Sequence, residues 1–336
     1  MTAHDTIQLA HGGGGHLSRI LVEEEILPRF GEGPLAPLPD AALLPSVRGD
    51  LLFTTDGFVV KPLEFPGGDI GSLAVHGTVN DIAVSGGKPL WLSLSLILEE
   101  GLPLALLRRI LDSVKEAARR SEVAICTGDT KVVARGECDG LFITTAGLGA
   151  RRDGFRLDRA TLRAGDCILV SGSVGDHGMA VLAAREQLAL THGPLSDSAP
   201  VNRLVDALAP RAGQVRFMRD PTRGGLAAVL NELVHGQPVG LEVRESDIPM
   251  AAAARSVAEL LGIDLLHAAS EGRMVLACAP EAANSILAAW RALPEGAGAA
   301  IIGHVTTTAG KVVLRTLSGG GRLVDWPRGE LLPRIC

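Results

Sequence analysis

The sequence predicts a two-domain protein with mixed α and β structure. The chain has 336 residues, enough for two domains with separate cores. In each half, short apolar runs typical of strands alternate with runs of helical periodicity. A stretch from Arg151 to Asp166 separates the two halves. We therefore expect domains at residues 1–155 and 156–317, followed by a flexible, glycine-rich tail at 318–336.

The composition excludes several classes of protein. Hydrophobic residues make up 46% of the chain and charged residues 21%, which is typical of a soluble globular protein. The net charge of −6 provides no positive footprint for a nucleic acid or an anionic membrane, so neither is an expected partner. Neither a signal peptide nor an apolar run of membrane-spanning length is evident, and we expect a cytoplasmic protein.

Helices and strands can be assigned to both halves. The first half reads β, α, β, α, β, β: strand 51–55 ending at Asp56, helix 70–83 with Asp69 as its N-cap, strand 90–98, helix 103–119, strand 123–126 and strand 140–147. The second half contains strands at 167–170, 241–243, 274–278, 301–305 and 311–316, and helices at 179–190, 222–235, 250–261 and 281–293. In the helix at 222–235, Asp220 is the expected N-cap and Pro221 the first helical residue.

Two kinds of feature suggest phosphate binding. Gly12, Gly13, Gly14 and Gly15 leave backbone N–H groups free to surround an anion, although a flexible N-terminal tail explains them equally well. Lys131, in a chain with few lysines, and Arg223, at an expected helix start, are candidate phosphate contacts. No P-loop motif occurs, and the glycine loop in 167–185 fits a dinucleotide site poorly.

Three aspartates are candidate metal ligands. Asp56, Asp81 and Asp129 lie at or near the ends of apolar elements, beside small residues. Carboxylates gathered there would suit Mg2+, whereas a single aspartate in such a place is usually a turn residue. His76 and Asn80 lie four residues apart on one helix face beside Asp81; a lone helix histidine is usually structural, but the three polar residues together also suggest a site.

The cysteines fall into two groups. Four lie in or beside apolar runs and are interpreted as small core residues: Cys126, Cys138, Cys167 and Cys278. Their scatter, the odd total and the absence of C-x-x-C argue against disulfides or a zinc site. Cys336 is the last residue, behind Pro333, so its sulfur could serve more than one site; chance placement is the alternative. An extended tail of about eighteen residues would reach roughly 60 Å.

The chain resembles the HypE family of hydrogenase maturation factors, in the aminoimidazole ribonucleotide synthetase (PurM-like) superfamily. The motifs that carry the resemblance span almost the whole chain: Gln8–Gly15, Thr54–Asp56, Pro66–Gly71, Val75–Asp81, Thr127–Val133, Asp220–Leu226, Glu271–Gly272 and the terminal Pro333–Cys336. The terminal motif is the most specific, because other members of the superfamily lack it. Gly57, Lys61, Leu265 and His267 depart from the family pattern and affect only the expected detail of the pocket.

The resemblance implies a fold and a set of site residues. The N-terminal domain would join a second copy in a dimer-spanning β-barrel, beside a C-terminal α+β domain. ATP and Mg2+ would bind in a cleft, with Asp56, Asp81 and Asp129 at the metal. The catalytic residues would be Cys336, Lys131, Arg223 and, as proton acceptor, Glu271. The nucleotide contacts would be Gly12, Gly13, Gly14, Asp56, His76, Thr78, Asn80, Asp81, Asp129, Thr130 and Asp220.

The resemblance also implies a reaction. HypF would place a carbamoyl group on the Cys336 sulfur, and ATP would phosphorylate the carbamoyl oxygen so that it can leave. The resulting S-cyanate would pass cyanide to an iron site on a HypC–HypD complex. Two alternatives remain: a related ATP-dependent enzyme for a small molecule, such as aminoimidazole ribonucleotide synthetase or thiamine-phosphate kinase, and a non-catalytic carrier of the thiol. Selenophosphate synthetase fits poorly, because no cysteine precedes Cys126.

Overall fold

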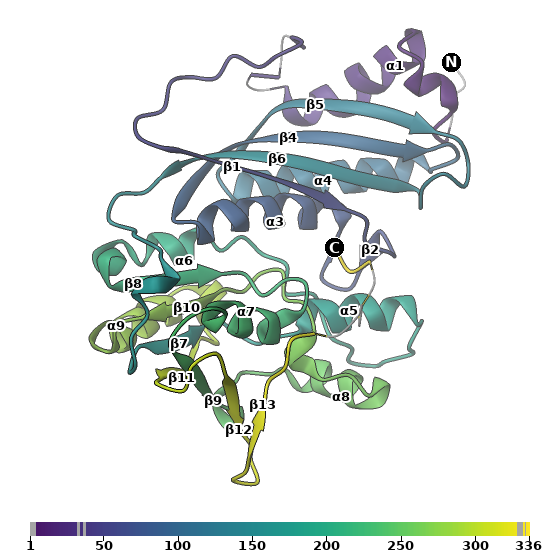
Figure 1. Ribbon diagram of the computed structural model, residues 1–336. Coiled ribbons are helices and arrows are strands. Elements are labelled where there is room, and N and C mark those ends of the chain that lie inside the picture. Colours follow the sequence, from purple (N-terminus) through teal and green to yellow (C-terminus); the bar gives the residue numbers. More distant parts are fainter. Residues whose placement is uncertain (1–4, 32–33, 36–37, 328–331, 333) are drawn as a thin grey trace. The chain divides into compact units, whose positions relative to one another are not determined.

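Two compact units make up the chain. The computed structural model describes residues 5–31, 34–35, 38–327, 332 and 334–336, traced in Figure 1. The first unit comprises Met1–Ile82, Gly87–Arg151 and Cys336, and the second comprises Ala83–Gly86 and Arg152–Ile335. Among the described residues, none of the helices has both the length and the apolar character needed to cross a membrane.

A four-stranded sheet forms the centre of the first unit. Its order is β1 (Leu51–Phe58), β6 (Leu141–Arg151), β4 (Gly87–Glu99) and β5 (Ala124–Val133). Strand β6 pairs antiparallel with β1 and β4, whereas β4 and β5 run parallel. A parallel pair needs a crossover connection, and helix α4 (Leu104–Arg120) provides it. The apolar stripe of α4 is buried, as its periodicity predicts.

Helix α3 (Ile70–Val84) is buried on nearly every side and, together with α4, covers one face of this sheet (Figure 1). The expected N-cap is confirmed, since Asp69 Oδ1 accepts a hydrogen bond of 2.9 Å from the Ser72 N–H. Glycine lets the two helices approach closely: a Cβ on Gly71 would lie 2.5 Å from the Ile110 carbonyl oxygen. Between β1 and α3, a short hairpin joins β2 (Glu64–Phe65) and β3 (Gly68–Asp69).

The glycine-rich N-terminal segment packs against β5. It contains a 3-10 turn, η1 (Leu9–Gly12), in which a Cβ on Gly12 would lie 2.8 Å from the Cβ of Val132. A flexible tail is therefore the wrong description of this segment. The amphipathic run that follows is α1 (His16–Ile20), a π-helical segment η2 (Leu21–Ile26) and α2 (Leu27–Phe30).

A seven-stranded sheet forms the centre of the second unit. Only β12 and β9 are parallel; all other neighbours are antiparallel. The strand order is β13 (Gly321–Leu323), β12 (Val312–Arg315), β9 (Gly240–Arg244), β11 (Ala300–Thr306), β7 (Cys167–Val170), β10 (Val275–Cys278) and β8 (Val215–Arg219).

Both faces of this sheet are buried. On β7, Ile168 and Val170 join an apolar cluster with α7 (Gly225–Val234). Leu169 points the other way, into a cluster with α6 (Asn202–Asp206) and α9 (Pro280–Arg291). A third cluster joins α5 (Asp176–Arg185) to α8 (Ala252–Leu261). Five 3-10 turns connect these elements: η3 (Arg159–Thr161), η4 (Ala209–Gln214), η5 (Glu245–Asp247), η6 (Leu265–His267) and η7 (Pro294–Gly296).

Helix α7 begins later than expected. Its N-cap is Gly224, at φ 79°, instead of Asp220. Pro221 is buried and its carbonyl oxygen accepts a hydrogen bond of 2.9 Å from the Ser270 N–H, so the chain there is bound to a neighbouring loop. The expected cap was wrong because this tertiary contact replaces the first helical turn.

The start of the expected tail belongs to the sheet. Strand β13 pairs with β12, and Val324 directly after it is buried. The Val324 N–H donates to the Val312 carbonyl at 2.9 Å, and Asn231 Nδ2 donates to the Val324 carbonyl at 3.0 Å. The chain is thus anchored as far as Val324.

Candidate functional site

A pocket of about 330 Å³ opens in the first unit. Its polar lining comes from the N-terminal segment and α1, with His11, Ser18 and the backbone of Gly12 and Gly14, and from β5, with Thr127, Asp129, Thr130 and Lys131. Its apolar wall includes Leu21, Val22, Ile26, Phe30, Leu94, Leu96 and Ile125. An apolar wall opposite backbone N–H groups and a cation suits a ligand with a flat base and a phosphate chain.

Strand geometry places the charged residues of this pocket on one face. The sequence led us to expect a loop after Cys126, but β5 continues through Val133 and pairs with β4. Asp129 and Lys131 are two residues apart and therefore share a face. Gly128 allows the close pairing, because a Cβ there would lie 2.4 Å from the Leu94 carbonyl oxygen.

Lys131 and Asp129 form an exposed ion pair. Lys131 Nζ lies 2.7 Å from Asp129 Oδ2, with the two side chains 63% and 57% exposed. The hydrogen bond from Lys131 lowers the pKa of the Asp129 carboxyl. An exposed pair of this kind adds little stability, about 0–1 kcal/mol, so the cation remains available to a ligand.

Two crossed hydrogen bonds join β1 to α3, and each of them ends on an aspartate, Asp56 or Asp81. Thr78 on α3 donates to Asp56 Oδ2 at 3.0 Å, and Thr54 on β1 donates to Asp81 Oδ2 at 2.8 Å. Thr78 Oγ1 also lies 2.5 Å from Thr145 Oγ1 on β6. The supporting roles of Thr54 and Thr145 were missed from sequence, because they depend on which strands become neighbours.

The third aspartate lies elsewhere in the sheet. Asp56 is on β1 and Asp129 on β5, and these strands form opposite edges of the sheet. Among the described residues, no group of three or more His, Cys, Asp or Glu is arranged to hold a metal ion. The oxygen donors of Asp56 and Asp81 still fit Mg2+, which takes one or two carboxylates and completes its shell with phosphate and water. The metal site stays a prediction.

The polar residues inside α3 do not line the pocket. His76, Thr78 and Asn80 are at most 4% exposed. Burial, with a smaller contribution from the Arg120 charge, lowers the pKa of His76 to about 3, so its imidazole is neutral at physiological pH. The nucleotide contacts expected for these residues remain predictions. The structure shows the hydrogen bond that Thr78 donates to Asp56.

The second unit places two of the expected site segments side by side. The hydrogen bond from Ser270 N to Pro221 O joins the turn after Asp220 to the loop that carries Glu271. Asp220 and Glu271 are buried, whereas Arg223 is exposed in the turn before α7.

Cys336 is partly exposed in the first unit, where a main-chain carboxylate oxygen of this residue accepts a hydrogen bond of 3.2 Å from the Val59 N–H. Pro333 lies outside the described residues. Cys126 and Cys278 are buried, but Cys138 and Cys167 are only partly so, which corrects the expectation of four core cysteines. Burial raises the pKa of all four thiols, which favours the protonated form.

Comparison with known proteins identifies the family of both domains. Residues 39–150 match the N-terminal domain of AIR synthase related proteins, and residues 163–315 match the C-terminal domain. Carbamoyl dehydratase HypE of Rhizobium leguminosarum bv. viciae is 48% identical over 336 residues, covering 99% of this chain and 96% of the relative.

Two solved structures are similar over nearly the full length. A crystal structure of hydrogenase maturation protein HypE in complex with ATP has a TM-score of 0.94 at 43% identity, covering 98% of this chain and 100% of that one. The structure of a HypE–HypF complex has a TM-score of 0.80 at 42% identity, covering 91% and 99%. The chain therefore belongs to the HypE family of AIR synthase related proteins.

Proposed function

We propose that this protein is an ATP-dependent carbamoyl dehydratase that acts on its own Cys336. The observation that carries the proposal is the pocket of the first unit, where a glycine segment, an apolar wall and Lys131 meet, in a chain that also carries Cys336. Relatives named carbamoyl dehydratase support it, as does the relative that binds ATP. The product would supply the cyanide ligands of a [NiFe]-hydrogenase iron centre.

The reaction balances without an oxidant or reductant. The carbamoyl oxygen of S–C(=O)–NH2 attacks the γ-phosphorus of ATP, and ADP leaves. The carbon–oxygen bond then breaks, phosphate departs with that oxygen, and the nitrogen loses both protons to give S–C≡N. ATP is needed because hydroxide is a poor leaving group and phosphate a good one.

Residues of this chain fit the roles that the reaction requires. Lys131 would stabilise the negative charge that develops during phosphoryl transfer, and Arg223 would do the same. Asp56 and Asp81 would hold Mg2+, which neutralises phosphate charge when bound. Glu271, a buried carboxylate, would accept protons from the carbamoyl nitrogen.

Three partners follow from this role. A second copy would extend the four-stranded sheet: Leu51 and Phe53 on its β1 edge are 57% and 69% exposed, an apolar surface suited to a homodimer-spanning barrel. HypF would donate the carbamoyl group, as the HypE–HypF complex of a relative suggests. A HypC–HypD complex would accept cyanide, and the process would take place in the cytoplasm.

The test follows the mass of the C-terminal peptide after incubation with HypF, its carbamoyl substrate and ATP. We expect a carbamoylated Cys336 that then loses one water. Cys336→Ser should abolish both changes, while Cys138→Ser, a partly buried control, should leave them intact. A small-molecule enzyme would keep its turnover in Cys336→Ser. A passive carrier of the thiol would not need ATP, so it would keep its function in Asp81→Asn. Normal dehydration by Asp81→Asn would contradict the proposal.

A further inference from the structure

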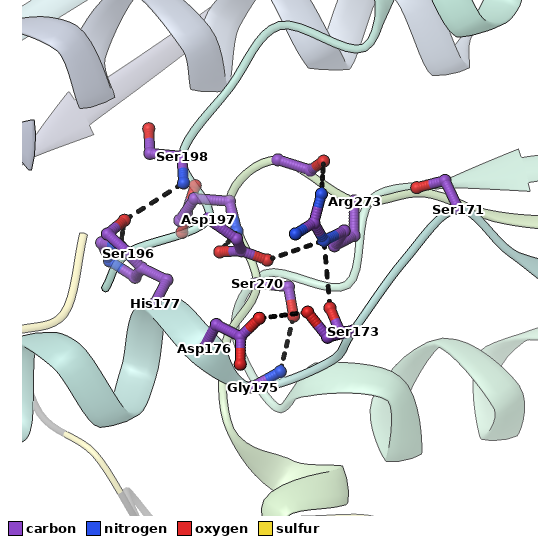
Figure 2. Close-up of polar contacts among 12 residues, drawn as sticks. Ser171, Ser173, Gly175, Asp176, His177, Ser196, Asp197, Ser198, Ser270 and Arg273 are labelled. Atoms are coloured by element: carbon purple, nitrogen blue, oxygen red, sulfur yellow. Dashed lines mark hydrogen bonds and ion pairs between the residues drawn. The ribbon is translucent and has the colours of Figure 1, made fainter. Parts of the chain in front are cut away.

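The second unit contains a buried polar cluster that the proposed function does not use. It surrounds the loop Ser196–Ser198 and the start of α5 (Figure 2). His177, in the first turn of α5, has no exposed surface. Its Nδ1 lies 2.8 Å from Ser196 Oγ, and its Nε2 lies 2.9 Å from the carbonyl oxygen of Ile335.

These two contacts determine the tautomer of His177. A carbonyl oxygen only accepts, so Nε2 must carry the proton and donate to Ile335. Nδ1 then accepts from the Ser196 hydroxyl, which itself accepts a hydrogen bond of 3.1 Å from the Ser198 N–H. Burial lowers the pKa of His177 to about 4, which keeps the ring neutral near pH 7 and preserves this arrangement.

A second donor on α5 binds the neighbouring carbonyl of the chain end. Arg185, the last residue of α5, donates to the Arg334 carbonyl oxygen at 2.6 Å. Ile335 is 4% exposed, and Leu332 packs against the apolar cluster of α5 and α8. The space for Leu332 depends on Gly178, where a Cβ would lie 3.3 Å from Leu332 Cδ1.

The residue after Ser196 holds the loop of Glu271. Asp197 Oδ1 accepts a hydrogen bond of 3.0 Å from the Glu271 N–H, and Asp197 Oδ2 lies 3.4 Å from Arg273 Nε. The same Arg273 nitrogen donates to the Ser173 carbonyl at 3.0 Å (Figure 2). Consecutive residues, Ser196 and Asp197, therefore fix the His177 ring and the Glu271 backbone.

We propose that His177 is a positioning residue that docks the chain end through the Ile335 main-chain carbonyl, with Arg185 as the second contact. The ligand is the C-terminal segment of the chain itself, recognised by the main-chain carbonyl groups of Arg334 and Ile335 and by the apolar side chains of Leu332 and Ile335. The Ser196–Asp197 pair keeps this dock in register with Glu271. The inference rests on the proposed function, in which the residue after Ile335 carries the reacting group.

Two substitutions of His177 separate docking from folding. The amide of glutamine reaches the position of Nε2 and can still donate to Ile335, whereas the shorter asparagine reaches only the position of Nδ1. Both remove the ring, so a merely structural role would affect them alike. His192→Asn, an exposed histidine of the same unit, is the matched control.

The main readout is the rate at which iodoacetamide alkylates Cys336 in the full-length protein, followed by peptide mass. We expect His177→Asn to raise this rate about two- to tenfold, the net effect of one hydrogen bond, and to lower dehydration by a similar factor. His177→Gln and His192→Asn should stay close to the parent, and the unfolding temperatures of the two His177 variants should agree.

Two results would overturn the dock: unchanged alkylation in His177→Asn, or His177→Gln as impaired as His177→Asn. If neither variant folds, Ser196→Ala and Arg185→Gln must both raise the alkylation rate, and failure of either one to do so overturns the dock. Alkylation needs no enzymatic activity. A parent protein that never dehydrates Cys336 while its alkylation follows the expected order would therefore refute the proposed function and leave the dock standing.

Discussion

Replacing Lys131 with methionine separates a role in chemistry from a role in stability. The ion pair with Asp129 is well over half exposed on both sides, so its loss should cost at most about 1 kcal/mol of unfolding free energy. If Lys131 instead stabilises charge during phosphoryl transfer, the substitution should lower the dehydration rate about 100- to 1,000-fold, as removal of one transition-state donor does in other enzymes.

A second lysine of the same unit is a matched control. Lys61 Nζ lies 2.7 Å from Asp139 Oδ1, with side chains 57% and 32% exposed, and it does not line the pocket. Lys61→Met should therefore match Lys131→Met in thermal unfolding but keep the parent turnover. The assay is the rate of water loss from carbamoylated Cys336 at saturating ATP. Turnover by Lys131→Met within about threefold of Lys61→Met would refute the reasoning, because that difference is under 1 kcal/mol.

Other perturbations test the fold and the second unit. The pKa of His76 in the folded protein is about 3, below its usual value of 6.5, so the unfolded chain binds the proton at a higher pH than the folded protein does. The free energy of unfolding should therefore fall by about 1.4 kcal/mol per pH unit as the pH drops from 6.5 toward 3. Urea unfolding should show a smaller fall in His76→Gln. Trp290 is fully buried, so Trp290→Ala should cost about 3–5 kcal/mol by urea unfolding, whereas Trp326→Ala, at a side chain 44% exposed, should cost far less. A Cβ on Gly272 would lie 1.9 Å from the Asp197 carbonyl oxygen, so Gly272→Ala should displace the Glu271 loop and lower dehydration about a hundredfold; unchanged turnover would mean that the loop position is unimportant.

Much of the first unit could be predicted from local patterns. The apolar periodicity of α4 and the capping side chain of Asp69 both depend on neighbours along the chain, and both predictions are confirmed. The extension of β5 through Val133 could not be predicted this way. Polar residues of the kind found in loops form a strand there because β4 offers a parallel partner.

The arrangement of the site depends on contacts that local patterns do not encode. Sequence pointed to Asp56 and Asp81, but their threonine partners come from β1 and α3, and a third threonine, on β6, contacts Thr78. The sequence indicated no role for His177 beyond its place in a glycine loop. Its hydrogen-bond partner Ile335 lies at the far end of the chain. A hydrogen bond between residues so distant in sequence leaves no periodic signal.

The anchoring of Val324 shortens the segment of chain that carries Cys336. Among the described residues, Val324 makes the last hydrogen bond to the sheet, so twelve residues, Asp325 to Cys336, follow it instead of the eighteen or so expected from the glycine-rich composition. At about 3.3 Å per residue, the sulfur can travel no further than about 40 Å from Val324, roughly two thirds of the expected radius. Under the proposed function, a cyanide acceptor would have to bind within this radius, and inserting residues after Val324 should extend it.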